Sequence, residues 1–307
     1  MTRIVCIGEC MVEMAPLAER GTYRMGFAGD TLNTAWYLAR LLCDRAQVSY
    51  FTAIGTDGIS DQMLTFLEDE NIGTRTIQRR TDRTLGLYMI QLQDGERSFS
   101  YWRGQSAART LAQSRPDLDA ALQDADIAYF SGITLAILSD WDRETLMRAL
   151  DRFSAAGGEI VFDPNLRPKL WPNANGMVNA IMQAAKLSDI VLPSFDDEAT
   201  WFGDQTPLAT AERYASHGAC TVVVKNGPGE IVLLNDWEIS RFTPTPMDDV
   251  VDTTAAGDSF NAGFLAGRIV GQSLEKAVAT AAALAARVVS HRGALVADAV
   301  TCTDLSG

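Results

Sequence analysis

Short apolar runs alternate with longer amphipathic segments along most of this chain. In its middle the runs predict strands and the segments predict helices, in the order strand 127–131, helix 140–155, strand 159–163, helix 176–187, strand 190–193, helix 209–217 and strand 221–225. Repeated strand–helix units predict an α/β fold with a mostly parallel central sheet, covered by helices on both faces. Because ligands of such sheets bind beyond the carboxyl ends of the strands, residues that directly follow a strand are candidates for a site.

The same alternation extends towards both ends of the chain. The further elements expected are strands at 4–8, 48–55, 231–234 and 238–242 and helices at about 28–42, 60–70, 256–270 and 274–290. No internal repeat, low-complexity linker or shift in composition divides the sequence. Residues 1–307 are therefore predicted to form a single domain.

Two insertions interrupt the alternation. Residues 11–27 are predicted to be extended and broken by turns, and residues 84–103 predict a hairpin, because strand-like segments flank Asp94-Gly95. We expect the two insertions, about 9–28 and 84–103, to form a small β-strand lid on the α/β body.

The hairpin has a predicted register. A two-residue turn sets Tyr88 opposite Tyr101 and Gly86 opposite Arg103, and alternate residues of a strand share a face. One face is thus predicted to carry two tyrosines and an arginine, with a glycine that leaves room beside the arginine. The alternative is a partly solvated edge hairpin without a ligand.

Composition limits the partners. The 307 residues carry a formal net charge of −13, which argues against binding to nucleic acid or to an anionic membrane. Any site for an anion must therefore be built from local Arg, Lys, magnesium and backbone donors. No apolar run reaches the roughly 18 residues of a membrane span, and the N-terminus lacks the pattern of a signal peptide.

The cysteines indicate a compartment. Cys6, Cys10, Cys43 and Cys220 lie among apolar residues and are interpreted as reduced core thiols. A cytoplasmic location is expected from this pattern.

One stretch, residues 252–264, combines the features of an anion site. Thr253 or Thr254 is expected to cap a helix whose first turn offers free backbone N–H groups and the positive end of the helix dipole. Small residues at 255–257 would let a ligand approach those N–H groups. Asp258 follows them, and an ionised carboxylate there can take the proton of an attacking hydroxyl during phosphoryl transfer. The alternative is a capped helix whose Asp merely complements the dipole.

Three further segments follow predicted strands. In 163–168, two prolines stiffen a loop from which Arg167 projects, and 225–229 is a glycine-rich turn that a nucleotide can approach. The segment 192–198 begins a helix with three acids, which either complement the dipole or hold magnesium. The sequence has no P-loop, no G-x-G-x-x-G, no G-x-S-x-G and no zinc-like Cys/His spacing, and its two histidines make a histidine-driven mechanism unattractive.

The stretch at 252–258 resembles the Asp-Thr-x-Gly-Ala-Gly-Asp signature of the PfkB, or ribokinase-like, carbohydrate kinases, and the resemblance extends over essentially the whole chain. The chain has Ala255 where most of the family has Gly, which keeps the N–H donor but loses easy access to positive φ. Where the family has an Asn-x-x-Glu magnesium motif, this chain has 194–197, with Asp197 as a shorter substitute. The usual Gly-Gly before the first helix is Ala28-Gly29.

Within the family, the chain looks most like the subgroup that phosphorylates 2-keto-3-deoxygluconate. The segments that carry this likeness are 7–11, 29–34, 101–103, 131–133, 165–168 and 252–260. The resemblance implies a ribokinase-like fold and transfer of phosphate from ATP, with Mg²⁺, to the terminal hydroxyl of the sugar acid. The paired arginines suit an acid better than a neutral sugar.

The resemblance also implies roles for individual residues. Asp258 would be the catalytic base, and Ala255, Ala256 and Gly257 would form the anion hole. The sugar acid would be held by Gly29, Asp30, Asn33, Tyr88, Tyr101, Arg103 and Arg167. The nucleotide would contact Asn165, Ser194, Lys225, Gly227, Gly229 and Gly257. Asp197 would hold Mg²⁺, and Asp252 and Thr254 would hold a monovalent cation such as K⁺.

Alternatives remain at this point. Another sugar kinase of the same family, acting on fructose, ribose or 2-keto-3-deoxygalactonate, would share the fold and the base. A sugar-acid sensor without catalysis would share the fold alone. The expected small-molecule partners are ATP and a sugar acid, and an exposed lid face predicts a homo-oligomer formed through the lid.

Overall fold

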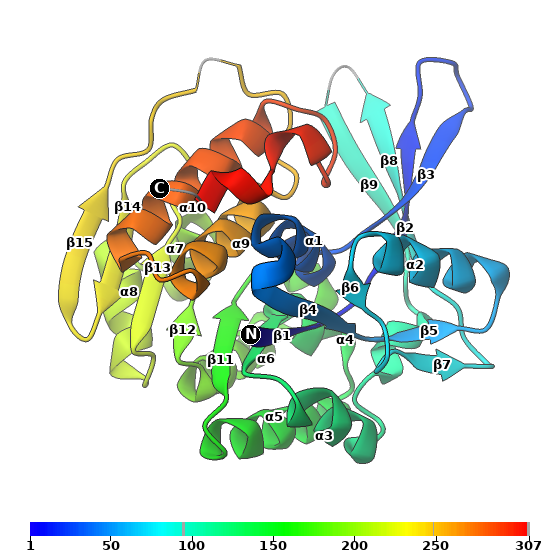
Figure 1. Cartoon of the computed structure of the whole chain (residues 1–307), viewed down its shortest axis with the longest axis horizontal. Coiled ribbons are helices and arrows are strands. Elements are labelled where there is room, and N and C mark those ends of the chain that lie inside the picture. Colours follow the sequence, from blue (N-terminus) through cyan, green and yellow to red (C-terminus); the bar gives the residue numbers. More distant parts are fainter. Residues whose placement is uncertain (94–95, 248, 306–307) are drawn as a thin grey trace.

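The computed structural model describes residues 1–93, 96–247 and 249–305, and its largest element is a nine-stranded sheet (Figure 1). The strands in spatial order are β15 (Glu238–Phe242), β14 (Ile231–Asn235), β13 (Thr221–Val224), β12 (Ile190–Val191), β11 (Glu159–Asp163), β10 (Ile127–Ser131), β1 (Thr2–Ile7), β4 (Ala46–Phe51) and β6 (Ile72–Gly73). All neighbours pair in parallel except β13–β14 and β14–β15, which are antiparallel. The predicted mostly parallel sheet is confirmed.

Helices cover both faces of this sheet (Figure 1). The α-helices are α1 (Asp30–Leu42), α2 (Gly58–Asp69), α3 (Arg115–Gln123), α4 (Gly132–Ile137), α5 (Asp140–Ala155), α6 (Ala174–Leu187), α7 (Phe195–Phe202), α8 (Pro207–Ser216), α9 (Ala256–Ile269) and α10 (Leu274–Val289). Short 3₁₀ turns are η1 (Cys43–Arg45), η2 (Ala107–Thr110), η3 (Pro168–Leu170), η4 (Ala297–Ala299) and η5 (Cys302–Leu305).

The core has two halves because successive residues of a strand point to opposite faces. In β1, Ile4 and Cys6 pack in the half that includes α1, α9 and α10, whereas Val5 and Ile7 pack in the half that includes α3, α5 and α6. These four consecutive residues are all buried, so this part of β1 is a continuous apolar run.

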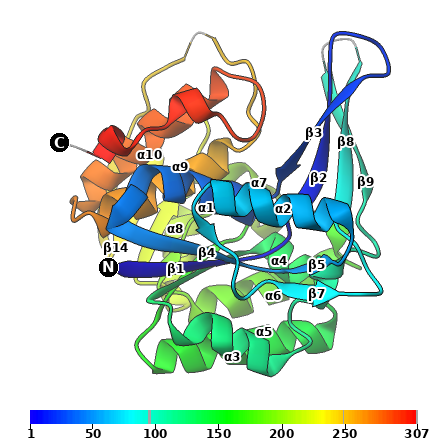
Figure 2. The same cartoon turned by 45° about the vertical axis from the view of Figure 1, so that its right-hand side comes forward.

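The lid is a separate four-stranded sheet that projects from the body (Figures 1 and 2). Its order is β3 (Tyr23–Ala28), β2 (Met11–Pro16), β8 (Gly86–Gln93) and β9 (Glu96–Trp102). The predicted hairpin register is confirmed, since Tyr88 pairs with Tyr101. The turn residues 94 and 95, on which the hairpin prediction was centred, lie outside the described residues.

The strand predicted at 48–55 is two strands. β4 ends at Phe51 and β5 (Ala53–Gly55) leaves the central sheet to pair with β7 (Gln78–Arg80). The backbone changes partner at buried Thr52, whose carbonyl accepts a bond from the N–H of Gln78. The apolar run continues through the change, so periodicity alone could not locate it.

The prediction of reduced core thiols is wrong for Cys43, which forms a disulfide with Cys302. Cys220, also predicted in the core, is free but exposed, while Cys6 and Cys10 are free and buried as predicted. Cys43 directly follows α1 and begins η1, and Cys302 begins η5, so the bond ties the C-terminal segment to the end of that helix. Because the two cysteines are 259 residues apart, sequence spacing gave no sign of the pairing.

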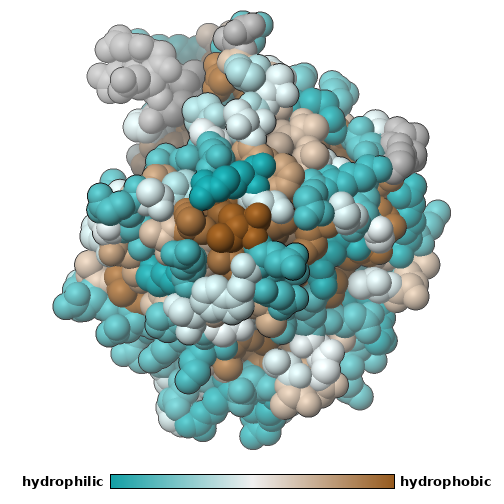
Figure 3. All heavy atoms as spheres, turned by 90° about the vertical axis from the view of Figure 1, so that its left-hand side faces the viewer, coloured by the Kyte–Doolittle hydropathy of each residue, from teal (hydrophilic) through white to brown (hydrophobic). Residues whose placement is uncertain are grey.

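The surface is mostly hydrophilic on the face shown in Figure 3, where hydrophobic residues gather in a central patch. In the ranges that the structure describes, no helix combines the length and apolar composition needed to cross a membrane.

Gly132, the first residue of α4, lies where a side chain has no room. A Cβ there would lie 1.9 Å from the carbonyl oxygen of Pro164, in the loop after β11. We expect Gly132→Ala to lower the free energy of unfolding by about 1–3 kcal/mol, because the backbone must move to relieve the overlap. Urea denaturation measures this. Gly176→Ala is the matched control: its Cβ would meet nothing closer than 3.5 Å, and helix propensity favours Ala by up to about 1 kcal/mol. Equal stability of the two variants would contradict the expectation.

Candidate active site

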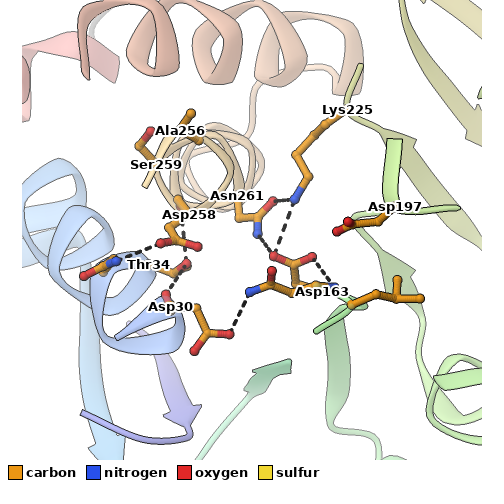
Figure 4. Close-up of polar contacts among 12 residues, drawn as sticks. Asp30, Thr34, Asp163, Asp197, Lys225, Ala256, Asp258, Ser259 and Asn261 are labelled. Carbon is orange, nitrogen blue, oxygen red and sulfur yellow. Dashed lines mark hydrogen bonds and ion pairs between the residues drawn. The ribbon is translucent and has the colours of Figure 1, made fainter. Parts of the chain in front are cut away.

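Polar side chains from several elements meet at the carboxyl edge of the central sheet. Asp163 ends β11, Ser194 follows β12, and Lys225 follows β13. The N-termini of α1 and α9 come to the same place, which brings Asp30 and Asp258 towards Asp163 (Figure 4). These polar side chains therefore gather where the sequence analysis expected a site, beyond the strand ends.

The first turn of α9 is opened by an unusual backbone conformation. Its N-cap is Ala255, at φ 60° and ψ 14°, and among the described residues no side-chain hydrogen bond caps the helix. The prediction of Thr253 or Thr254 as the N-cap is therefore wrong: the chain turns through the left-handed region one residue later. That region favours glycine, which is the residue the resemblance led us to expect here. The first bond of the helix runs from the N–H of Ser259 to the carbonyl of Ala255, and the N–H of Ala256 donates to the carbonyl of Thr253 at 3.2 Å, so the N–H groups of Gly257 and Asp258 precede the helical ladder.

Asp258 lies in this first turn and is held from α1. The amide of Asn33 donates to its carboxylate at 2.8 Å, and the hydroxyl of Thr34 donates to its backbone carbonyl at 3.3 Å. Burial raises the pKa of Asp258 to about 8; the nearby carboxylates of Asp30 and Asp163 also raise it, whereas Asn33 and Lys225 lower it. A carboxyl group with a pKa near the working pH is suited to act as a general base.

A hydrogen-bonded chain links Asp30 to Asp163. The amide of Asn165 donates to Asp30 at 2.9 Å, and its backbone N–H donates to Asp163 at 3.2 Å. Asn165 has a φ of 34°, a second non-glycine residue in the left-handed region. Its side chain therefore contacts Asp30, which the resemblance implies would hold sugar hydroxyls, and the nucleotide contact expected of Asn165 stays a prediction.

Asn261 and Tyr129 were missed by the sequence analysis. Asn261 bonds Lys225, Asp163 and the Tyr129 hydroxyl, all within buried surroundings. Burial raises the pKa of Tyr129 well above its usual range, which keeps the phenol neutral. Asn261 was findable, because it lies three residues after Asp258 on the same helix face.

Two residues predicted to contact the nucleotide, Ser194 and Lys225, lie next to each other. Ser194 and Lys225 form an isolated parallel bridge, which joins the ends of β12 and β13. Gly227 has a φ of 49°, so the turn after β13 uses the conformational freedom that only glycine has without strain. The backbone N–H of Gly229 closes this turn onto Asn226.

Two carboxylates that the sequence analysis did not assign contact lid residues expected to hold the sugar acid. Arg103 forms an ion pair with buried Glu9, and the Tyr88 hydroxyl donates to Glu13. The room that Gly86 was predicted to leave beside Arg103 is taken by Glu9, whose Oε1 lies 2.8 Å from where a Cβ on Gly86 would be. Within the described residues, that Oε1 has no hydrogen-bond partner, and neither has the buried Nε of Arg103. The rings of Tyr88 and Tyr101 lie 5.9 Å apart between centroids, as the register predicted.

Arg167 lies beside the acidic start of α7. Its guanidinium is 3.4 Å from Asp197 and its side chain is half exposed. Burial raises the pKa of Asp197, and Arg167 opposes that effect. The next acid, Glu198, is fully buried and bonds Arg213 and Tyr214, so it is structural and not available to magnesium.

The carboxylate of Asp252 accepts two backbone N–H groups. One comes from Thr254 at 3.0 Å and the other from Gly293 at 2.6 Å. Asp252 thus fixes the segment that leads into α9. Among the described residues, no group of three or more His, Cys, Asp or Glu side chains is placed to hold a metal ion.

The fold and this site define a carbohydrate kinase of the ribokinase-like type. Residues 1–299 match the model of the pfkB family of carbohydrate kinases, and the chain belongs to that family. It is 41% identical over 305 residues to a 2-dehydro-3-deoxygluconokinase of Haemophilus influenzae, with 96% of each protein covered.

Solved structures share the fold. A PfkB protein from Polaromonas sp. JS666 superposes with a TM-score of 0.86 at 27% identity, with 99% of each chain covered. A fructokinase from Xylella fastidiosa with bound ATP superposes with a TM-score of 0.83 at 24% identity, covering 99% of this chain and 97% of that one.

The raised pKa of Asp258 has a consequence for stability. Between about pH 4 and about pH 8 the folded chain keeps a proton that the unfolded chain has released, so stability falls as the pH rises through this range. An asparagine at this position cannot ionise and keeps an oxygen for Asn33. We expect Asp258→Asn to melt at a higher temperature than the wild type at pH 8, with the difference shrinking towards pH 4.

The measurement is thermal unfolding followed by circular dichroism across this pH range. Asp119→Asn is a control of opposite sign, because a hydrogen bond from Arg152 lowers the pKa of Asp119. Asp119→Asn should destabilise the chain relative to the wild type at neutral pH, and this difference should shrink as the pH falls. A wild type as stable as Asp258→Asn at pH 8 would contradict the burial argument.

Proposed function

We propose that this protein transfers the γ-phosphoryl group of ATP to the terminal hydroxyl of 2-keto-3-deoxy-D-gluconate (2-dehydro-3-deoxygluconate), giving the 6-phosphate and ADP. The observation that carries the proposal is Asp258, partly buried in the first turn of α9, held by the amide of Asn33 and with a pKa raised to about 8. Identity of 41% to a 2-dehydro-3-deoxygluconokinase over 96% of the chain supports the substrate.

In this proposal Asp258 accepts the proton of the sugar hydroxyl. The hydroxyl oxygen then forms a bond to the γ-phosphorus, while the bond from that phosphorus to the bridging oxygen of ADP breaks. Of the predicted anion-hole residues, Ala256 donates its N–H to the carbonyl of Thr253. The N–H groups of Ala255 and Gly257 stabilise the charge that develops on the phosphoryl oxygens, and the small side chains at 255–257 admit them. Lys225, Ser194 and the turn with Gly227 and Gly229 border the nucleotide.

The sugar acid would lie between α1 and the lid. Gly29, Asp30 and Asn33 would hold hydroxyl groups, and Asn165, bonded to Asp30, would fix the orientation of that carboxylate. Tyr88, Tyr101 and Arg103 of the lid, together with Arg167, would hold the acid end. Nε of Arg103 is buried and has no hydrogen-bond partner in the part of the chain that the structure describes, so a substrate oxygen can accept from it.

Magnesium fits this site as an ion held by one carboxylate, the nucleotide phosphates and water. Asp197 is a single carboxylate, and Mg²⁺ bound to nucleotide phosphates needs one or two carboxylates plus water. Asp197 would hold the ion, which when bound neutralises phosphate charge. Asp252 and Thr254 remain the proposed place for K⁺, although the two carboxylate oxygens of Asp252 already accept backbone N–H groups.

The proposal includes a cytoplasmic location, where ATP is available, and a homo-oligomer that pairs lids. The lid exposes Tyr23, Met25, Phe99, Tyr101 and Trp102, a set of large apolar side chains that a second copy can cover. The rival functions are a kinase for fructose, ribose or 2-keto-3-deoxygalactonate and a sugar-acid sensor. The raised pKa of Asp258 favours a kinase over the sensor, because a sensor has no use for a base.

Turnover tests the reaction and separates these alternatives. We expect ATP- and Mg²⁺-dependent formation of ADP with 2-keto-3-deoxygluconate, much less with fructose or ribose, and a loss of about 10³-fold or more in kcat for Asp258→Asn. A coupled ADP assay over a panel of sugars and sugar acids is the measurement. Sugar-acid binding without turnover would favour the sensor, and faster turnover of a neutral sugar would reject the substrate.

The two arginines are expected to act on the acid and not on ATP. Arg167→Gln and Arg103→Lys should raise KM for the sugar acid about tenfold or more, because each removes a forked donor from a carboxylate, while KM for ATP changes little. Arg75→Gln is the control, since Arg75 is exposed and pairs only with Asp124 in the described structure. Small, equal changes in both KM values would count against an acid substrate.

A further inference from the structure

A buried cation and a buried carboxylate lie between the proposed base and the nucleotide turn. Lys225 and Asp163 are 8% and 3% exposed, and Nζ is 3.5 Å from Oδ2. Burying two charges is costly unless each is neutralised and hydrogen-bonded. Lys225 and Asp163 do not belong to the hydrophobic core, so apolar packing does not explain why both are buried at the strand ends.

Asn261 is bonded to both members of the pair. Its Oδ1 accepts from Lys225 at 2.9 Å and its Nδ2 donates to Asp163 at 2.8 Å and to the Tyr129 hydroxyl at 3.0 Å. Because Asn261 is on α9, three residues after Asp258, it fixes the ammonium group to the same helix that carries the base (Figure 4).

The ammonium group also lies at the start of that helix. A Cβ on Gly257 would be 3.6 Å from Nζ of Lys225, and Gly257 belongs to the first turn, where N–H groups precede the ladder. An ammonium group has three N–H donors, and Asn261 and Asp163 engage two of them. The third can meet an oxygen of a group bound at the N-terminus of α9.

We propose that Asp163 and Asn261 are positioning residues: they hold the ammonium of Lys225 against the first turn of α9, and Asp163 balances its charge until the transferred phosphoryl group arrives. Lys225 then contacts that group directly, alongside the backbone N–H donors. The inference rests on the proposed function, in which a phosphoryl group passes this turn.

Asp163 and Lys225 also shift the pKa of Asp258. The charged side chains that shift its pKa are on α1 (Asp30), β11 (Asp163) and the segment after β13 (Lys225). Tyr37 of α1 and Tyr129 of β10 are further titratable groups coupled to it, and burial keeps both neutral. Asp163 and Lys225 act on Asp258 in opposite directions, which gives the inference a signed test.

The experiment compares Lys225→Met and Asp163→Asn by the pH profile of kcat/KM, whose acid limb reports ionisation of the base in the free enzyme. Losing Lys225 should move the acid limb to higher pH, and losing the charge of Asp163 should move it to lower pH. Lys225→Met should also weaken ATP binding, measured by calorimetry without sugar, by at least about tenfold. Asn261→Ala should weaken ATP binding in the same direction, because it releases the ammonium group.

Glu159→Gln is the matched control. Glu159 begins β11, the strand that ends in Asp163, and pairs with Arg268 near the end of α9, the helix that begins with the base. The substitution Glu159→Gln removes an ion pair between β11 and α9 at the ends of these elements far from Asp163 and Asp258. It should therefore alter stability and leave the acid limb and the ATP affinity unchanged. A merely structural role for Asp163 would make the two variants behave alike.

Two results would overturn the inference. One is acid limbs of Lys225→Met and Asp163→Asn that coincide with the wild type, with unchanged ATP affinity. The other is a rise in the Mg²⁺ concentration needed by Asp163→Asn with its acid limb in place, which would make Asp163 a metal ligand. Failure of the wild type to phosphorylate any sugar acid would reject the proposed function alone, because the ATP affinities still test the role of Lys225.

Discussion

The partial burial of Asp258 among other charges is the constraint on which the site depends. A carboxylate largely removed from water and close to Asp30 and Asp163 is disfavoured as an anion, and its raised pKa expresses that cost. Lys225, the amide of Asn33 and the positive end of α9 oppose the cost. The carboxyl group is thus held near the point at which it can both lose and gain a proton.

This arrangement requires backbone conformations that side chains rarely adopt. Ala255 at φ 60° opens the first turn of α9, and Asn165 at φ 34° turns its amide onto Asp30. Each conformation costs about 1–3 kcal/mol, so the surrounding contacts must enforce it. For Ala255, those contacts include the bonds of Asp252 to Thr254 and Gly293, which fix the chain immediately before the turn.

Local sequence signals predicted most of the fold and part of the site. The alternation of apolar runs and amphipathic segments located the sheet strands and helices, and Asp94-Gly95 with its flanking strands set Tyr88 against Tyr101. The site residues that lie in one segment, such as 255–258, were predicted for the same reason. Glu9, Tyr129 and Asn261 were not, because their roles arise from neighbours distant in sequence: Glu9 meets Arg103 across 94 positions and Asn261 meets Tyr129 across 132. The Cys43–Cys302 bond and the strand change at Thr52 were missed for the same physical reason.

Each cation expected to hold an anionic group in this site is already beside a carboxylate. Arg103 pairs with Glu9, Arg167 with Asp197 and Lys225 with Asp163. Arg103 and Lys225 are largely buried, and a buried cation without a partner is costly, so local pairing stabilises the fold. An anionic ligand must then share or displace a carboxylate at each cation. Breaking these ion pairs costs an anionic ligand part of its binding free energy, but the ligand forms new ion pairs with the same cations. A neutral sugar brings no charge to replace the carboxylate, so it gains nothing by breaking the pairs. Paired cations therefore favour charged substrates through the exchange itself, and the long-range field of the protein, which repels anions, leaves selection to these contacts.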